Sequence, residues 1–261
     1  MPIPDVIAGP RAKLRRAEHH LDELKAAVQA YRGAEPFSVE RNQAPATGDI
    51  LYSVRVSRPI PEDWPLIAGD IIHNARSALD HLAAQLVQAA GGQVTETTAF
   101  PFAKSHSTLQ QTAATRLAGA APSARRFAER LRPFPGGNRL LLLLHHLDII
   151  DKHRLLFIVG AAYQHFELNV RLLRPAGKAT LPLPPIRIRP ADRQFPLVDG
   201  GVLLKVAAAA SGSHMAEPRF AFEIALGEPG DPSGEPILKL LADIVSHVAR
   251  IIDIAERWLL R

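Results

Sequence analysis

Hydrophobic residues recur at helical spacing in several parts of the chain. In the first of these, five apolar residues from Leu14 to Tyr31 repeat three to seven positions apart, with charged residues between them. This pattern is typical of an amphipathic helix, and Gly33 marks its end. Similar patterns, bounded by proline, glycine and capping residues, predict further helices. The region 105–131 is predicted to form two helices with a break near Pro122. The other predicted helices span about 10–31, 62–90, 140–154 and 235–261.

Other segments alternate apolar and polar residues at every second position. The alternation is clear from Ile50 to Val56, and it recurs over 166–172 and 220–226. A period of two residues predicts half-buried strands, and 202–206 is predicted as another. The prolines between 175 and 196 indicate irregular connections and an edge strand.

The strands are flanked by helices on both sides, and no repeat or linker divides the chain. We therefore predict one α+β domain over 1–261, in which a helical bundle packs on a small antiparallel sheet. The helical core is expected at about 10–31, 62–154 and 235–261, and the sheet at about 50–58 and 155–227.

Composition limits the chemistry that the chain can perform. Hydrophobic residues make up 47% of the sequence, which is enough for a sizeable core. The chain has no cysteine, which excludes a disulfide, a thiol nucleophile and a thiolate metal site. Its net charge of +5 permits contact with phosphates but does not require it. Neither a signal peptide nor a membrane-spanning run is seen, so a cytoplasmic location without membrane contact is predicted.

Two predicted helices concentrate the residues that can carry function. Between 66 and 90 one face is apolar, and His73, Arg76 and Asp80 fall together on the opposite face. Arg76 and Asp80 are four residues apart and can form an ion pair along the helix. One interpretation of this face is a solvated polar surface.

The second of these helices offers another interpretation. A helical wheel of the predicted helix 140–154 places His146 and His153 on one largely apolar face. An imidazole that is buried on such a face needs a hydrogen-bond partner. His73, Asn74 and Asp80 are suitable partners if the two helices pack together. Such an arrangement is either a structural network of histidine, aspartate and arginine or a functional pocket, and the sequence leaves both open.

Three segments resemble a family of bacterial proteins. They are Gly69 to His81, which reads GDIIHNARSALDH, Phe100 to Phe102, which reads FPF, and Leu147 to Arg154, which reads LDIIDKHR. No activity is assigned to that family. The resemblance, over roughly 60–160, therefore implies a shared domain and no particular chemistry.

A shorter motif resembles the HEPN domains of bacterial toxin and defence systems. Those domains carry an arginine followed after four to six residues by a histidine on one helix, and Arg76 and His81 fit this spacing. The resemblance implies a homodimer that binds RNA in its cleft and cleaves it without a metal or another cofactor. The arginine steadies the charge on the phosphate, and the histidine, with His73 nearby, transfers a proton at the 2′-hydroxyl. Ser77 stands where that family usually has asparagine or aspartate.

The spacing of this motif has a geometric consequence. On an ideal helix Arg76 and His81 point about 140° apart, so one chain does not easily direct both side chains to one phosphate. We therefore expect the pair to converge across a dimer rather than within a chain.

Metal and nucleotide-driven chemistry are disfavoured. The chain lacks His-Glu-x-x-His and Glu-x-x-His, and His146 and His153 lie two turns apart, about 10 Å. Phosphate-binding glycine loops and the Gly-x-Ser-x-Gly elbow are also missing. We expect no metal site, and two classes of function remain. One is a metal-independent ribonuclease, and the other is a non-catalytic interaction protein whose surface is the predicted sheet with Arg55, Arg171, Arg187 and Arg189.

Overall fold

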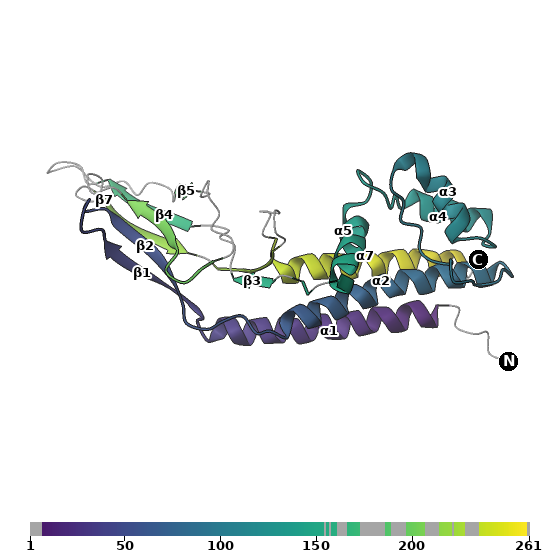
Figure 1. Ribbon diagram of the computed structural model, residues 1–261, viewed down its shortest axis with the longest axis horizontal. Helices are drawn as coiled ribbons and strands as arrows, with labels where there is room; N and C mark the ends of the chain where they lie inside the picture. The colour runs from purple at the N-terminus through teal and green to yellow at the C-terminus, as the bar shows by residue number, and fades with distance from the viewer. Residues whose placement is uncertain are drawn as a thin grey trace. The chain divides into compact units, whose positions relative to one another are not determined.

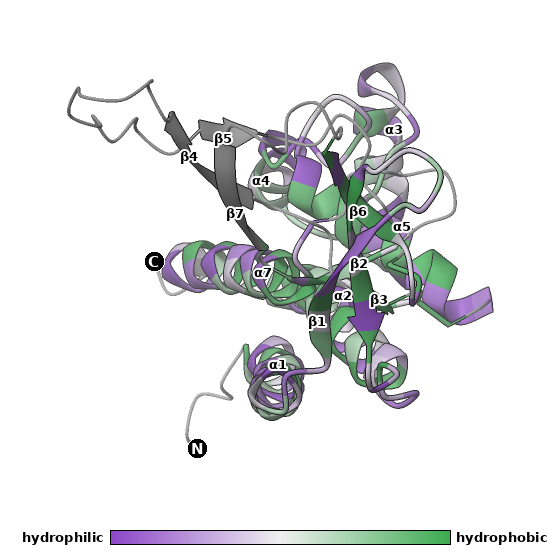
Figure 2. Ribbon diagram, turned by 90° about the vertical axis from the view of Figure 1, so that its left-hand side faces the viewer, coloured by the Kyte–Doolittle hydropathy of each residue, from purple (hydrophilic) through white to green (hydrophobic). Residues whose placement is uncertain are grey.

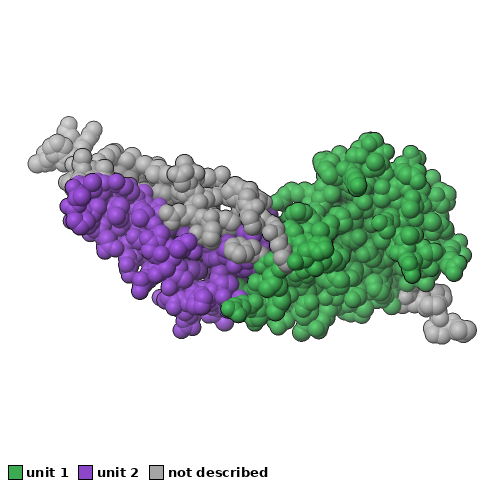
Figure 3. All heavy atoms as spheres, viewed as in Figure 1, with its two compact units in different colours: residues 1–26, 62–156, 238–261 green, residues 27–61, 157–237 purple. Residues whose placement is uncertain are grey.

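The structure is a computed structural model of the chain. It describes residues 7–153, 155–156, 158–160, 166–172, 186–188, 197–206, 214–220, 222–227 and 235–259. Contacts within the chain divide it into two compact units (Figure 3). Unit 1 comprises 1–26, 62–156 and 238–261, and unit 2 comprises 27–61 and 157–237.

The two units separate helices from strands nearly as the sequence predicts. The helices of the described residues belong almost entirely to unit 1, and the strands belong to unit 2. The predicted α+β class, with a helical bundle and a small antiparallel sheet, is confirmed. The statement that the chain forms a single domain stays a prediction.

Three long helices run side by side in unit 1 and are crossed by a shorter one (Figure 1). An ion pair of 2.8 Å between Arg11 and Asp253 joins the first of the long helices to the last. Figure 2 shows hydrophobic and hydrophilic residues interleaved along these helices, as an amphipathic helix requires. The helices are α1 (Ala8–Gly33), α2 (Trp64–Ala89), α3 (His106–Arg116), α4 (Pro122–Arg130), α5 (Arg139–His153) and α7 (Ile237–Leu259).

Helix α2 forms the centre of unit 1 because its apolar stripe is fully covered. Every residue of the predicted stripe is buried, which confirms the apolar face predicted for 66–90. Pro65 lies in the first turn of α2, where its missing N–H costs no hydrogen bond. The buried residues of the stripe are Ile71, Ala75, Ala78, Leu79, Leu82 and Leu86.

The predicted break near Pro122 is also confirmed. Helix α3 begins with a capping box, in which the Ser105 side chain accepts from the Thr108 N–H and the Thr108 side chain accepts from the Ser105 N–H. Pro122 occupies the first turn of α4. The turn that follows α2 and the turn between α3 and α4 meet closely, since a Cβ at Gly92 would lie 2.7 Å from the carbonyl oxygen of Gly119.

Unit 2 contains antiparallel strands. In one sheet β2 lies between β1 and β6, and an irregular register occurs at Tyr52 and Ser53. A two-stranded sheet pairs β3 with β8, and a third sheet has the order β5-β4-β7. The strands are β1 (Phe37–Gln43), β2 (Ile50–Val56), β3 (Ile158–Gly160), β4 (Phe166–Leu172), β5 (Ile186–Ile188), β6 (Val202–Val206), β7 (His214–Phe220) and β8 (Ile224–Leu226).

Two of the strand predictions need correction. The segment 220–226 is not one strand, because Phe220 ends β7 and Ile224 begins β8. These two strands pair with different partners, β4 and β3, although the alternation of the sequence runs through both. Strand β1 was not predicted, since its sequence FSVERNQ is largely polar and mostly exposed. The proline-rich segments 175–185 and 189–196, with Arg189, lie outside the described residues, as do the side chains of Arg171 and Arg187.

No helix in the described part of the chain has both the length and the apolar character needed to cross a membrane.

Candidate functional site

The three segments of the bacterial family resemblance meet in unit 1. Helices α2 and α5 are packed against each other. This packing is the condition under which polar side chains of the two helices can be hydrogen-bond partners. The segment 100–102 lies against both helices through the contacts described below. The polar groups at this junction form two clusters, one around Arg76 and one around His73.

Arg76 is enclosed rather than solvated. Its side chain is 11% exposed, and Nη1 lies 2.5 Å from Oδ1 of Asp80. Its Cζ lies 4.5 Å from the centre of the Phe102 ring. The His145 ring also stacks on Phe102, with 4.4 Å between the ring centres and 11° between the ring planes. The Nε and Nη1 atoms have no well-aligned hydrogen bond among the described residues. The predicted ion pair is therefore present, but the interpretation of this face as a solvated surface is wrong at Arg76.

Asp80 connects helix α2 to the segment 100–102. Its Oδ1 accepts a hydrogen bond of 2.8 Å from the Phe100 N–H, besides its contact with Arg76. The Phe100 ring is buried and lies 5.3 Å from that of Phe102. One carboxylate thus fixes both a guanidinium and a backbone segment, which is a structural role.

His145 is the inward histidine of α5. Burial lowers its pKa, and the positive charge of Arg76 lowers it further. Its Nδ1 is buried without a hydrogen-bond partner among the described residues. Both effects favour the neutral imidazole, which stacks on Phe102 without repelling Arg76.

The second cluster is built around a buried carboxylate. The Asp148 side chain is 3% exposed, and its Oδ1 lies 3.4 Å from Nδ1 of His73. Its other oxygen accepts a hydrogen bond of 2.6 Å from Nζ of Lys152. The His73 ring is 52% exposed, and its Nε2 lies 3.5 Å from the Ser77 hydroxyl. An accessible imidazole is thus backed by a carboxylate that faces it from a buried position.

Asp151 adds a second carboxylate to this cluster. It packs directly over Gly69 of α2, where a Cβ would clash with the carboxylate of Asp151. Burial raises its pKa, and the negative charge of Asp148 raises it further. Gly69 therefore permits the close approach of α5 to α2 at this level.

The remaining predicted residues of α2 lie apart from these clusters. The Asn74 side chain is buried and donates a hydrogen bond of 2.8 Å to the carbonyl of Asp70 in its own helix. His81 is directed toward α1, since a Cβ at Gly9 would lie 3.0 Å from its Nδ1. Arg76 and His81 therefore do not converge within one chain, as their spacing predicts. Their convergence across a dimer stays a prediction.

The prediction that His146 and His153 lie on an inward face is wrong. Both are exposed, and Ile149 on the same face is 42% exposed. The first two turns of α5 are leucine on nearly every side, so the apolar pattern does not indicate which face is covered. The buried face is instead Leu141, Leu144, Leu147, Asp148 and Ile150.

Five residues of these clusters were not among the predicted site residues: Phe102, His145, Asp148, Asp151 and Lys152. Asp148 belongs to the LDIIDKHR segment and Phe102 to the FPF segment, so the resemblance pointed to the correct neighbourhood. The residue types at this junction suit proton transfer by His73 and charge stabilisation by Lys152. Within the described ranges no three histidine, aspartate or glutamate side chains are grouped so as to hold a metal ion.

No protein-family model, curated protein or solved structure matches the chain. Both resemblances therefore stay predictions.

Proposed function

We propose that the protein cleaves RNA without a metal ion and that His73 is the group that accepts the proton of the attacking 2′-hydroxyl. One observation supports this role above others. His73 is the accessible imidazole at the junction of α2 and α5, and a buried carboxylate, Asp148, faces its Nδ1 at 3.4 Å. This pairing orients the ring and leaves Nε2 toward solvent and Ser77.

The reaction balances without a cofactor. His73 takes the proton of the 2′-hydroxyl, and the 2′-oxygen forms a bond to phosphorus. The bond from phosphorus to the 5′-oxygen breaks, and that oxygen takes a proton from the imidazolium or from water. The products are a 2′,3′-cyclic phosphate and a 5′-hydroxyl. Lys152, whose ammonium donates to Asp148, is the cation that we assign to the charge that develops on the phosphate.

This proposal changes the role of Arg76. In the HEPN resemblance the arginine meets the phosphate, but here its guanidinium is covered by Phe102 and paired with Asp80. We assign it a positioning role, in which it holds the segment 100–102 against α2.

A second candidate is a non-catalytic interaction protein. The observation that favours it is the stack of Arg76, Phe102 and His145, in which the two polar side chains are covered by packing rather than presented to a ligand. On this candidate the pairing of His73 with Asp148 also serves only to join α2 and α5.

A cleavage assay separates the two candidates. Purified full-length protein is incubated with labelled single-stranded RNA in the presence of a chelator, and the product ends are identified. We expect a 5′-hydroxyl product from the unmodified protein, and a loss of about 10²–10⁴-fold in rate for His73→Gln. The matched control is His146→Gln, which removes an exposed histidine of α5 and is expected to retain the full rate.

Three outcomes decide the proposal. Absence of cleavage above background by the unmodified protein overturns it and favours the interaction protein. Equal rates for His73→Gln and His146→Gln overturn the role of His73. If His73→Gln keeps full activity and His81→Ala loses activity, the role of His73 is overturned and the result supports a HEPN-like site across a dimer.

A further inference from the structure

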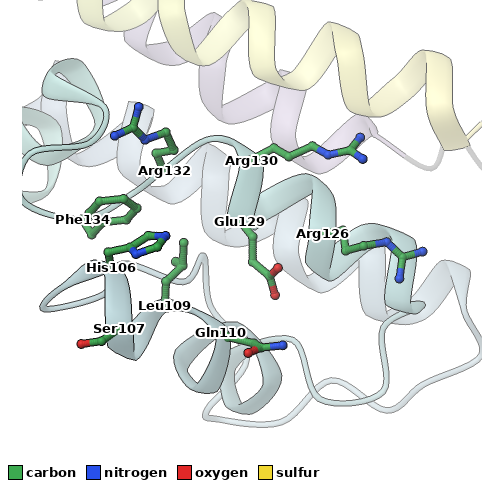
Figure 4. A pocket seen from close by; sticks show the side chains of 9 residues that line it. All are labelled: His106, Ser107, Leu109, Gln110, Arg126, Glu129, Arg130, Arg132 and Phe134. Carbon is green, nitrogen blue, oxygen red and sulfur yellow. The ribbon is translucent and has the colours of Figure 1, made fainter.

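A pocket of about 880 Å³ lies between α3 and α4, away from the junction of α2 and α5 (Figure 4). Its volume is within the usual range for small-molecule sites. Its walls come from α3, α4 and the loop that follows α4, all within unit 1. The residues of this pocket play no part in the function proposed above.

The α4 side of the pocket is cationic. Arg126 and Arg130 are four residues apart, so they share a face of the helix, and both are exposed. Neither is paired with a carboxylate among the residues that the structure describes. Arg132 adds a third guanidinium, and Glu129 is the carboxylate among the lining residues. Figure 4 shows Arg126, Glu129 and Arg130 extending from α4.

The other end of the pocket is aromatic. Phe134 is buried and contacts Ala103 and Leu109 in a small apolar cluster. The His106 ring lies 5.1 Å from the Phe134 ring, and Figure 4 shows the two side by side. His106 is itself exposed, so a planar group can reach its ring from the pocket.

The loop between these two ends is held in a fixed conformation. Arg132 has a φ of 54°, in the left-handed region that costs a non-glycine residue conformational energy. Its carbonyl accepts hydrogen bonds from the N–H groups of Phe134 and Asn138, at 2.9 and 2.8 Å. The Arg132 guanidinium lies 5.6 Å from the Phe134 ring and donates to the Gly136 carbonyl at 3.5 Å. Arg132 and Phe134 are thus positioned together before any ligand binds.

We infer that this pocket binds a nucleoside phosphate, either free or as a unit of an RNA strand. The arginines supply charge and hydrogen-bond donors for the phosphate, and His106 beside Phe134 supplies a surface on which a base stacks. Ser107 and Gln110 also line the pocket, and their polar side chains offer hydrogen-bonding groups for the sugar. This inference does not rest on the cleavage of RNA by His73.

Calorimetric titration of the full-length chain tests the pocket. The probes are adenosine 5′-monophosphate, adenosine and inorganic phosphate, each at low salt. We expect the monophosphate to bind at least about tenfold more tightly than adenosine or phosphate, because only it engages both ends of the pocket. The Arg126→Gln, Arg130→Gln double variant is expected to weaken its binding by about tenfold or more. His106→Ala is expected to weaken the binding of the monophosphate but not the binding of inorganic phosphate.

The matched control is Arg16→Gln, which removes an exposed arginine of α1 in the same unit. Tryptophan fluorescence checks that every variant is folded, since Trp64 and Trp258 both belong to unit 1. Equal affinities in the double variant and in this control overturn the inference. Inorganic phosphate binding as tightly as the monophosphate overturns the nucleoside part.

A short oligoadenylate RNA identifies the source of the ligand. Its binding is measured in the His73→Gln background, so that cleavage does not interfere and failure of the ribonuclease proposal leaves this result readable. RNA binding that is tighter than monophosphate binding and equally sensitive to the double variant assigns the pocket to an RNA strand. Monophosphate binding without RNA binding assigns it to a free nucleotide, and binding of neither overturns the inference.

Discussion

Removal of the charge on Asp80 tests whether the Arg76 cluster is structural. The variant Asp80→Asn keeps the size of the side chain and an oxygen that can accept from the Phe100 N–H. It removes the negative charge that faces Arg76, whose side chain is 11% exposed. The guanidinium is then left with the Phe102 ring and without an anion.

The expected cost follows from two contributions. An exposed pair at this helical spacing contributes about 0.3–0.5 kcal/mol, whereas the enclosure of Arg76 raises this to about 1 kcal/mol. We keep this figure low because Asp80 itself is 37% exposed and is partly screened by water. Replacing a charged acceptor by a neutral one weakens the bond to Phe100 by about 1 kcal/mol. The variant is therefore expected to lose about 2 kcal/mol of the free energy of unfolding.

Urea unfolding followed by tryptophan fluorescence measures this loss in unit 1, to which both tryptophans belong. The control is Asp243→Asn, which breaks an exposed pair of 2.6 Å with Lys239 at the same spacing in α7. The control is expected to lose less than about 0.5 kcal/mol. If the two variants have the same unfolding midpoint, Arg76 is screened by solvent and the structural role assigned to it is wrong.

Three further predictions concern the pH dependence and packing of unit 1. Because the pKa of His145 is lowered in the folded chain, its contribution to stability is complete above about pH 6.5 and declines as the pH falls; unfolding of His145→Gln from pH 8 to 5 is expected to lack this decline. The raised pKa of Asp151 has the opposite effect on the pH dependence of stability, because ionisation of this carboxyl costs stability as the pH rises above 3.8. Thermal melts are expected to show Asp151→Asn as more stable than the unmodified chain at pH 7, with the difference vanishing in acid. Gly92→Ala is expected to lose roughly 1–3 kcal/mol because its Cβ would meet the backbone of Gly119. Gly33→Ala, which has open space, serves as its control in circular dichroism melts, and an equal loss in both would contradict the packing argument.

The helices with one clear apolar stripe could be predicted from the sequence. The stripe of α2 and the break at Pro122 are confirmed because both depend on short-range geometry. The pairing of Arg76 with Asp80 is of the same kind, since four residues on a helix bring two side chains together whatever surrounds them. Strand β2 was found because its alternation is complete, and β1 was missed because polar residues outnumber apolar ones in it.

The sequence by itself determined the class of the fold, the positions of the main helices and which polar residues share a face of α2. Tertiary structure decided which face of α5 is covered, because a helix start made of leucines gives no preferred direction until a neighbour packs on it. It also decided that Phe102 covers Arg76 and that Asp148 faces His73. These contacts join residues at least 26 positions apart in the chain, and no local pattern specifies which distant side chain fills a given space.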